Sequence, residues 1–219
     1  MAVLAFILTI FTAYLLGSIP TGFLVGKSKG IDIRTVGSGN IGATNAFRIL
    51  GKPAGIFVLL ADALKGWLAV AIVAPLMQAW LAPSLNQIAA EWLRLSAALA
   101  AVLGHNYTCF LHFKGGKGIA TSAGVLIALV PWALLIIGIV FLVVVALTRY
   151  ISLGSISASF TLPFATWITT KSINMTVVTA IMATLAIYKH RGNIKRLLEG
   201  TESQFGRKQS QNGRGSPHP

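Results

Sequence analysis

The apolar runs of this chain are too long for helices that face water. A membrane helix needs about 20 consecutive apolar residues, because the hydrocarbon core is about 30 Å thick. Hydrophobic residues make up 55% of the 219 residues and charged residues only 11%, against about 25% in an average soluble chain. The sequence therefore predicts a helical integral membrane protein without a separate soluble domain. The runs lie near 3–26, 54–75, 88–111, 118–150, 151–170 and 173–189.

The first apolar run lacks the features of a cleaved signal peptide. No basic residue precedes it and no small-residue cleavage pattern follows it, whereas Lys27 and Lys29 come directly after it. Basic residues tend to remain on the cytoplasmic side of a membrane. We therefore expect this segment to be retained, with its N-terminus outside.

The segment 118–150 decides how many spans there are. As one helix it would be about 50 Å long, which exceeds a core of about 30 Å, whereas two helices would each be short. As one span it would also place the basic tail 189–208 and the first basic loop on different sides of the membrane. With a turn near Pro131, fifteen Lys and Arg residues lie inside and only Arg94 and Lys171 outside, as the positive-inside rule requires.

We therefore predict an all-α polytopic membrane protein. Its fold would be a bundle of seven transmembrane helices, with the N-terminus outside and the C-terminus cytoplasmic. Residues 1–202 would form the membrane domain, and the polar, Gly- and Ser-rich residues 203–219 a disordered cytoplasmic tail.

Charge and cysteine usage exclude several classes of function. The net charge of +13 would suggest nucleic acid in a soluble protein, but here it follows from cytoplasmic basic loops, so no nucleic-acid partner is expected. The single cysteine, Cys109, excludes an intrachain disulfide and is too few for a thiolate metal site. No metal and no cofactor are expected.

Three polar clusters remain, all on the inner face in the seven-span topology. The first motif, 37–48, reads GSGNIGATNAFR. Its glycines allow positive φ and can aim several N–H groups at one point. If the chain after Gly42 is helical, Thr44 and Arg48 share a face, and loop amides, helix start and guanidinium would form a phosphate cradle. A flexible loop with an orientation-setting arginine is an equal alternative from this segment alone.

The second motif, 104–124, contains GHN followed by FKGGKG at the start of a predicted helix. Such a loop is again an anion nest. The Walker A spacing fails, because Gly118 stands where Ser or Thr is needed, and no carboxylate is near to hold Mg²⁺. The alternative is a basic loop that touches anionic lipid headgroups. His105 is expected to orient the loop.

The third motif, 189–202, places His190 and Asn193 on one helical face. These two are the functional candidates, whereas Lys195 and Arg196 are interpreted as a juxtamembrane basic anchor. Within the second span, Asp62 and Lys65 are expected to pair with each other or with a neighbour across the bundle.

These motifs resemble those of the bacterial acyl-phosphate:glycerol-3-phosphate acyltransferases, the PlsY family. The matching segments are SGNIGATNAFR (38–48), GHNYTCFLHFKGGKGIATSAG (104–124) and HRGNIKRLLEGTE (190–202). Their order extends over nearly the whole chain except 203–219, and Gly192 is the one departure. The resemblance implies a seven-helix bundle in the bacterial plasma (inner) membrane, with the active site at its cytoplasmic face.

The implied activity moves a fatty acyl group from acyl phosphate to the 1-hydroxyl of glycerol 3-phosphate. The products are lysophosphatidic acid and inorganic phosphate, in the first step of phospholipid synthesis. The implied partners are glycerol 3-phosphate, long-chain acyl phosphate, membrane lipid and the soluble enzyme that makes acyl phosphate.

The resemblance also implies residue roles. Those for glycerol 3-phosphate are Ser38, Asn45, Arg48 and Lys117; those for acyl phosphate are Gly115, Gly116, Gly118 and Thr121; the catalytic pair is His190 and Asn193; and the orienting residues are His105, Asn40, Thr44 and Glu202.

Acyl phosphate is already an activated anhydride, so positioning and charge neutralisation are the main requirements. The H-x-x-x-x-D motif of acyl-CoA-dependent acyltransferases is absent, because Phe110, Lys117 and Lys195 stand five residues after the internal histidines. Direct attack by the glycerol hydroxyl is therefore favoured over an acyl-enzyme. Two candidates for the base stay open, the substrate's own phosphate and His190.

A transporter of phosphorylated metabolites is the rival class. Such a protein needs polar groups near the membrane midplane and often has repeated halves. Only Asp62 and Lys65 are deep in the predicted spans, so the sequence favours the enzyme.

Overall fold

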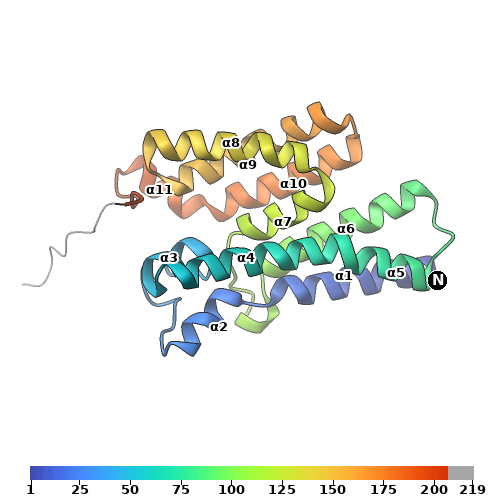
Figure 1. Ribbon diagram of the computed structural model, residues 1–219, viewed down its shortest axis with the longest axis horizontal. Helices are drawn as coiled ribbons and strands as arrows, with labels where there is room; N and C mark the ends of the chain where they lie inside the picture. Colours follow the sequence, from blue (N-terminus) through green and yellow to red (C-terminus); the bar gives the residue numbers. More distant parts are fainter. Residues whose placement is uncertain (207–219) are drawn as a thin grey trace, which may run out of the picture.

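Helices form most of the computed structural model, which describes residues 1–206, and no β-strand occurs in that range (Figure 1). The predicted all-α class is confirmed. The described part of the predicted tail, 203–206, begins by packing on the bundle, because Phe205 N donates to Arg149 O at 2.7 Å. The remainder of that tail, 207–219, lies outside the described residues. The elements are α1 (Ala2–Ser18), α2 (Thr21–Ser28), α3 (Ala43–Leu50), α4 (Lys52–Leu68), η1 (Ala69–Val73), α5 (Ala74–Leu81), α6 (Gln87–Asn106), η2 (Cys109–Leu111), α7 (Ile119–Leu129), α8 (Pro131–Thr148), α9 (Ile151–Thr170), α10 (Ile173–Lys189) and α11 (Arg191–Leu198).

Prolines set two of the helix breaks. The residue before proline is disfavoured in the α conformation, and both Ile19, before Pro20, and Val130, before Pro131, leave it. The second break divides 118–150 into α7 and α8, as expected from the sequence. Pro75 is accommodated differently, because the π-helical turn η1 lies just before it and α4 continues into α5.

Four segments among residues 1–206 are long and apolar enough to cross a membrane. They are Ala2–Ser28, Lys52–Leu81, Pro131–Thr148 and Ile151–Thr170. The apolar helices α7 and α10 are shorter, and the 11 residues of α7 rise only about 16 Å. The predicted count of seven spans and the orientation of the termini therefore stay predictions.

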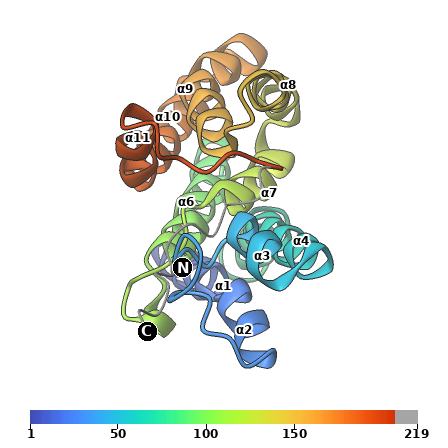
Figure 2. The ribbon, with the colours of Figure 1, turned by 90° about the vertical axis from the view of Figure 1, so that its left-hand side faces the viewer.

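The helices form two groups with α6 and α7 between them (Figure 2). One group contains α8, α9 and α10, and the other contains α1 to α4; α1 packs on α6, and α4 packs on α7. Small residues allow this close approach. A Cβ at Gly17 would collide with Ala101 O of α6, and one at Gly124 with Ala63 O of α4.

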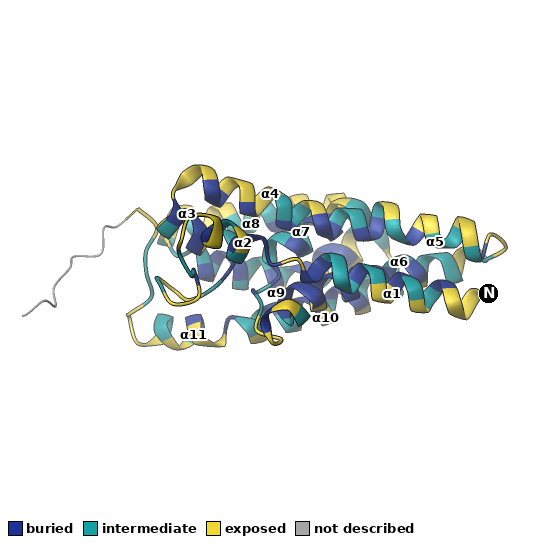
Figure 3. Ribbon diagram, turned by 90° about the horizontal axis from the view of Figure 1, so that it is seen from below, coloured by how far each residue is buried: buried dark blue, intermediate teal, exposed yellow. Residues whose placement is uncertain are grey.

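Buried residues follow the inward faces of the helices, and exposed residues lie along their outer faces (Figure 3). The outer faces carry large apolar side chains such as Leu142, Leu147 and Trp132, which suit contact with lipid. One end of the bundle differs, because α2, α3, α11 and the glycine loops gather there, opposite the N-terminus (Figure 1). That end carries the three motifs.

Candidate active site

A chain of hydrogen bonds joins the second and third motifs. Lys117 Nζ donates to Asn193 Oδ1, and Asn193 Nδ2 donates to Glu202 Oε1 at 2.6 Å. The same oxygen accepts from Ser152 Oγ at 2.7 Å, and Arg196 Nε donates to Glu202 Oε2 at 2.7 Å. The network therefore ties the second glycine loop (113–118) to α9, α11 and the segment after α11.

The charges in this network shift one another's pKa. Burial raises the pKa of Glu202, but hydrogen bonds from Ser152, Asn193 and Arg196 outweigh it, so the pKa lies below its usual value. Burial is the main cause that lowers the pKa of Lys117 to about 8. The negative charge of Glu202 opposes this shift, and the positive charges of Arg196 and Arg48 add to it. Near neutral pH, Lys117 is therefore a partly buried ammonium, and Arg48 of the first motif is near enough to act on it.

His190 lies between α10 and α11 with only 3% of its surface exposed. Its Nδ1 is 2.8 Å from Ala186 O, which selects the tautomer that keeps the proton on Nδ1 and leaves Nε2 as the acceptor. Burial, together with the charge of Lys117, lowers the pKa of His190 to about 4. The ring is therefore neutral at pH 7 and weakly basic.

The first motif folds around the side chain of Asn45, which is 1% exposed. Its Oδ1 accepts from Ser38 N at 3.0 Å, and its Nδ2 donates to the carbonyls of Ile33, Val36 and Asn40 at 2.9–3.1 Å. Asn45 thus shapes the loop from inside, and the direct contact with glycerol 3-phosphate predicted for it has no support from this geometry.

Other parts of the first motif agree with the expectation of a shaped loop. Gly37 and Gly39 have φ of 61° and 67°, which an L side chain rarely adopts. Asn40 Oδ1 accepts from Gly42 N at 2.8 Å, just before α3 begins.

The outer face of the first motif is exposed among residues 1–206. The expected helix after Gly42 is α3, so Thr44 and Arg48 share one face. Both are exposed, as is Ser38. Within residues 1–206 none of these three side chains makes a hydrogen bond or an ion pair. They are available to a ligand.

The second glycine loop closes onto the end of α6. Gly115 N donates to Asn106 O at 3.3 Å, and Gly116 N donates to His105 O at 3.0 Å. A Cβ at Gly115 would collide with His105 O, and one at Gly116 with His105 Nε2. These two N–H groups therefore already donate to carbonyls of α6. This differs from the prediction that Gly115, Gly116 and Gly118 together bind acyl phosphate. Close packing is the reason that both positions need glycine.

The free amides of this motif lie one residue further on. Gly118 has φ of 82° and precedes α7. In the described part of the chain, the N–H groups of Lys117, Gly118 and Ile119 have no hydrogen-bond acceptor. Unpaired N–H groups at a helix start attract anions. The ammonium of Lys117, which donates to Asn193 Oδ1, belongs to the same loop.

Two further residues of the second motif are fully buried. Thr121 packs against α4, where a Cβ at Gly66 would collide with Thr121 O, so the structure does not present Thr121 to a substrate. Asn106 is also buried, and its side-chain amide has no partner among the described residues. His105, predicted to orient the loop, is 4% exposed and lies directly beneath Gly116.

Several residues of the site are not predicted from the sequence. Ser152 is one of many hydroxyl residues in the spans, and no local signal distinguishes it. Arg196 is predicted from the sequence to be a basic anchor, but it pairs with Glu202; a spacing of six residues is not a helical pairing, and the pair forms because α11 ends at Leu198, before Glu202. Lys189 donates to Asn106 O at 2.9 Å and lies over the ring of Tyr107 at 4.5 Å, and so links α10 to α6.

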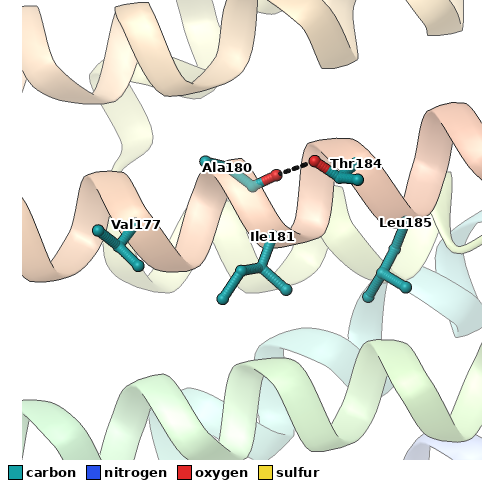
Figure 4. A pocket seen from close by; sticks show the side chains of 5 residues that line it. All are labelled: Val177, Ala180, Ile181, Thr184 and Leu185. Atoms are coloured by element: carbon teal, nitrogen blue, oxygen red, sulfur yellow. Dashed lines mark hydrogen bonds between the residues drawn. The ribbon is translucent and has the colours of Figure 1, made fainter.

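An apolar groove runs along α10 toward His190. It is lined by Val177, Ala180, Ile181, Thr184 and Leu185, and its volume is about 390 Å³. Figure 4 shows the side chains of Val177, Ile181 and Leu185 on one face of α10, pointing toward the neighbouring helix. Leu185 precedes His190 by five residues, so the groove leads toward the polar end of the bundle.

Comparisons with known proteins show the family of this chain. Residues 7–200 match the family model described as glycerol-3-phosphate acyltransferase. A protein of that name from Trichlorobacter lovleyi is 48% identical over 193 residues, which are 88% of this chain and 94% of the relative. One from Geotalea daltonii is 46% identical over 201 residues, which are 92% of this chain and 98% of the relative.

Two solved structures are also similar. Both are of PlsY (YgiH), an integral membrane glycerol 3-phosphate acyltransferase. Its glycerol 3-phosphate form has a TM-score of 0.81 and 40% identity, covering 92% of this chain and 96% of that one. Its lysophosphatidic acid form has a TM-score of 0.77 and 39% identity, covering 94% and 95%. This chain therefore belongs to the glycerol-3-phosphate acyltransferase family, as an integral membrane acyltransferase.

Proposed function

We propose that the protein transfers a fatty acyl group from acyl phosphate to the 1-hydroxyl of glycerol 3-phosphate. The products are 1-acylglycerol 3-phosphate and inorganic phosphate. The main observation in support is that Lys117 connects two groups that attract anions at one end of the bundle. These are the free N–H groups before α7 and the guanidinium of Arg48. The backbone N–H of Lys117 is one of the free amides before α7, its ammonium donates to Asn193 Oδ1, and the charge of Arg48 acts on that ammonium. Two phosphate-bearing substrates need such an arrangement.

Glycerol 3-phosphate is assigned to the face of the first motif. Ser38 and Arg48 would bind its phosphate, with Lys117 shared between the two substrates. The guanidinium offers two parallel donors to a phosphate, and Thr44 lies on the same face. Asn40 and Asn45 would act by holding the loop in shape. The related PlsY structure in its glycerol 3-phosphate form supports this substrate.

Acyl phosphate is assigned to the start of α7. The free N–H groups of Gly118 and Ile119 would donate hydrogen bonds to its phosphate, and Lys117 would neutralise the charge that grows on it as the anhydride breaks. Gly115 and Gly116 would allow the loop to lie close to α6. Thr121 would support α7 from within rather than touch the substrate.

In the reaction, the 1-hydroxyl oxygen attacks the acyl carbonyl carbon, and the bond from that carbon to the phosphate oxygen breaks. The hydroxyl proton must pass to a base. A phosphate ester has its second pKa near 6, whereas the pKa of His190 is about 4, so a substrate phosphate is the stronger base. His190 and Asn193 would then orient the hydroxyl, with Glu202 holding Asn193.

The acyl chain is assigned to the groove along α10, which opens to lipid and leads toward His190. The site would face the cytoplasm from the bacterial inner membrane. A soluble enzyme that makes acyl phosphate would supply the donor there. Nothing in the site favours the rival transport function.

The direct test is phosphate release by purified protein in detergent. With palmitoyl phosphate alone, release is expected to stay at the uncatalysed rate, and added glycerol 3-phosphate is expected to start it. Lys117→Met is the loss-of-function control. Equal release with and without glycerol 3-phosphate would contradict acyl transfer, and no release in either case would remove acyl phosphate as donor.

A further inference from the structure

A buried charged cluster lies beneath the second glycine loop. Asp62 and Lys65 on α4 and His105 on α6 are 2%, 4% and 4% exposed. Lys65 Nζ is 2.8 Å from Asp62 Oδ1, and His105 Nδ1 is 3.7 Å from the same oxygen. Ionisable groups inside a membrane protein are expensive and commonly mark function. The proposed reaction does not use the Asp62–Lys65 pair directly.

The cluster is anchored at the break between α1 and α2. Thr21 Oγ1 donates to Asp62 Oδ1 at 3.1 Å, and Lys65 Nζ donates to Ile19 O at 2.8 Å. Asp62 is thus held by Thr21 of α2 and by Lys65 of its own helix, and it faces His105 of α6, whose Nδ1 has no hydrogen-bond partner among residues 1–206. Because Lys65 balances its charge, the carboxylate can remain ionised and fixed within the bundle.

His105 connects this cluster to the loop. Its Nδ1 side faces Asp62, whereas its Nε2 occupies the space that a Cβ at Gly116 would need. The backbone is fastened at the same point, since Gly116 N donates to His105 O. The loop therefore rests on the ring, and the next residue is Lys117. A tilt of the ring would move Gly116 and with it the ammonium at the site.

We propose that Asp62 is a positioning residue for the second glycine loop. It fixes the ring of His105, the ring supports Gly116, and the loop then presents Lys117 and the free amides before α7. This inference rests on the proposed function, which assigns these amides to acyl phosphate. It extends that function, because it assigns the buried Asp62–Lys65 pair of α4 a role in the binding of acyl phosphate.

The first test is the kinetics of Asp62→Asn, which keeps the shape of the side chain but removes its charge. The KM for palmitoyl phosphate is expected to rise at least tenfold. The KM for glycerol 3-phosphate is expected to rise less, because Ser38 and Arg48 of the first motif keep their positions and only the contribution of Lys117 is disturbed. Equal changes in both KM values, or a loss confined to kcat, would overturn the proposal.

A matched control is Glu91→Gln. Glu91 is also a carboxylate that links helices, since Ser172 Oγ donates to it at 3.2 Å, but it lies near the other end of α6. Its KM for palmitoyl phosphate is expected to remain within twofold of wild type. A rise equal to that of Asp62→Asn would show a general response to weakened helix packing and would overturn the proposal.

The route through His105 is tested by a double-mutant cycle. His105→Ala is expected to raise the KM for palmitoyl phosphate, and adding Asp62→Asn is expected to change it no further, because the intermediary is gone. Effects that multiply would mean that the two residues act independently and would overturn the route.

If Asp62→Asn does not accumulate in the membrane, a second cycle keeps the proposal testable. Gly116→Ala should raise the same KM by pushing against the ring, and His105→Ala should relieve part of that loss in the double variant. If the two single losses instead multiply in the double variant, the ring of His105 does not support Gly116, and the proposal is overturned. Wild-type turnover is measured first: its absence would contradict the proposed function, whereas turnover with an unchanged KM in Asp62→Asn would contradict only this inference.

Discussion

Arg48 is exposed and forms no hydrogen bond or ion pair within residues 1–206, although its charge acts on Lys117. A guanidinium that the fold does not use for its own stability is free to bind a substrate phosphate. Arg48→Lys keeps the charge but loses the planar pair of donors.

We therefore predict that Arg48→Lys weakens apparent affinity for glycerol 3-phosphate. Loss of one charge-assisted hydrogen bond corresponds to about 1.5–3 kcal/mol, which is roughly a 10- to 100-fold rise in KM. The measurement is steady-state kinetics at saturating palmitoyl phosphate. Wild-type KM in this variant would remove Arg48 from the phosphate site.

Lys117 predicts an alkaline limit to activity. Its pKa is lowered to about 8, so the ammonium that binds phosphate is present below pH 8 and is lost as the pH rises through that value. The kcat/KM for palmitoyl phosphate, which reports the free enzyme, should fall above pH 8 by nearly tenfold per pH unit. Lys117→Arg should abolish this limb, because arginine stays protonated. A wild-type profile that is flat to pH 10 would contradict the assignment.

At the residue scale, the sequence predicted which side chains belong to the site better than what each of them does. Ser38 and Arg48 could be recognised because they are polar residues of a glycine-rich motif, and both are exposed in the structure. The role of Asn45 could not, since its acceptors at Ile33, Val36 and Asn40 depend on the path of the whole loop. The glycines at 115 and 116 were also ambiguous, because an anion and a neighbouring histidine ring both exclude a Cβ.

At the scale of elements, breaks were easier to predict than lengths. Pro131 acts on its own neighbours, so the division of 118–150 into two helices could be predicted from the sequence. The short length of α7 could not, because the chain before it is held in a loop by contacts with α6 that are distant in sequence.

The groove along α10 gives a prediction about chain length. Ile181 lies in the middle of its lining, so Ile181→Trp should fill the groove there. The kcat/KM for palmitoyl phosphate is expected to fall at least tenfold more than that for octanoyl phosphate, whose shorter chain ends before the obstruction. A matched substitution on an outer face, Leu142→Trp, should leave the ratio unchanged. Equal losses for both donors would contradict the groove assignment.

At the scale of the whole molecule, the three motifs lie at one end of the bundle, because the segments that carry them connect helices, or follow α10, at that end (Figure 1). The predicted topology puts that end in the cytoplasm. A reporter that is active only in the cytoplasm should be active when fused after Thr201 and inactive when inserted near Lys171. Equal signals at both positions would contradict the seven-span topology.

The central claim is that one membrane site joins an acyl phosphate to glycerol 3-phosphate. The most direct measurement is product formation from labelled glycerol 3-phosphate by the purified protein, with palmitoyl phosphate or palmitoyl-CoA as the donor. We predict 1-palmitoylglycerol 3-phosphate and inorganic phosphate in equal amounts from palmitoyl phosphate, and no product from palmitoyl-CoA. Product from palmitoyl-CoA alone, or phosphate release without labelled lipid, would contradict the account.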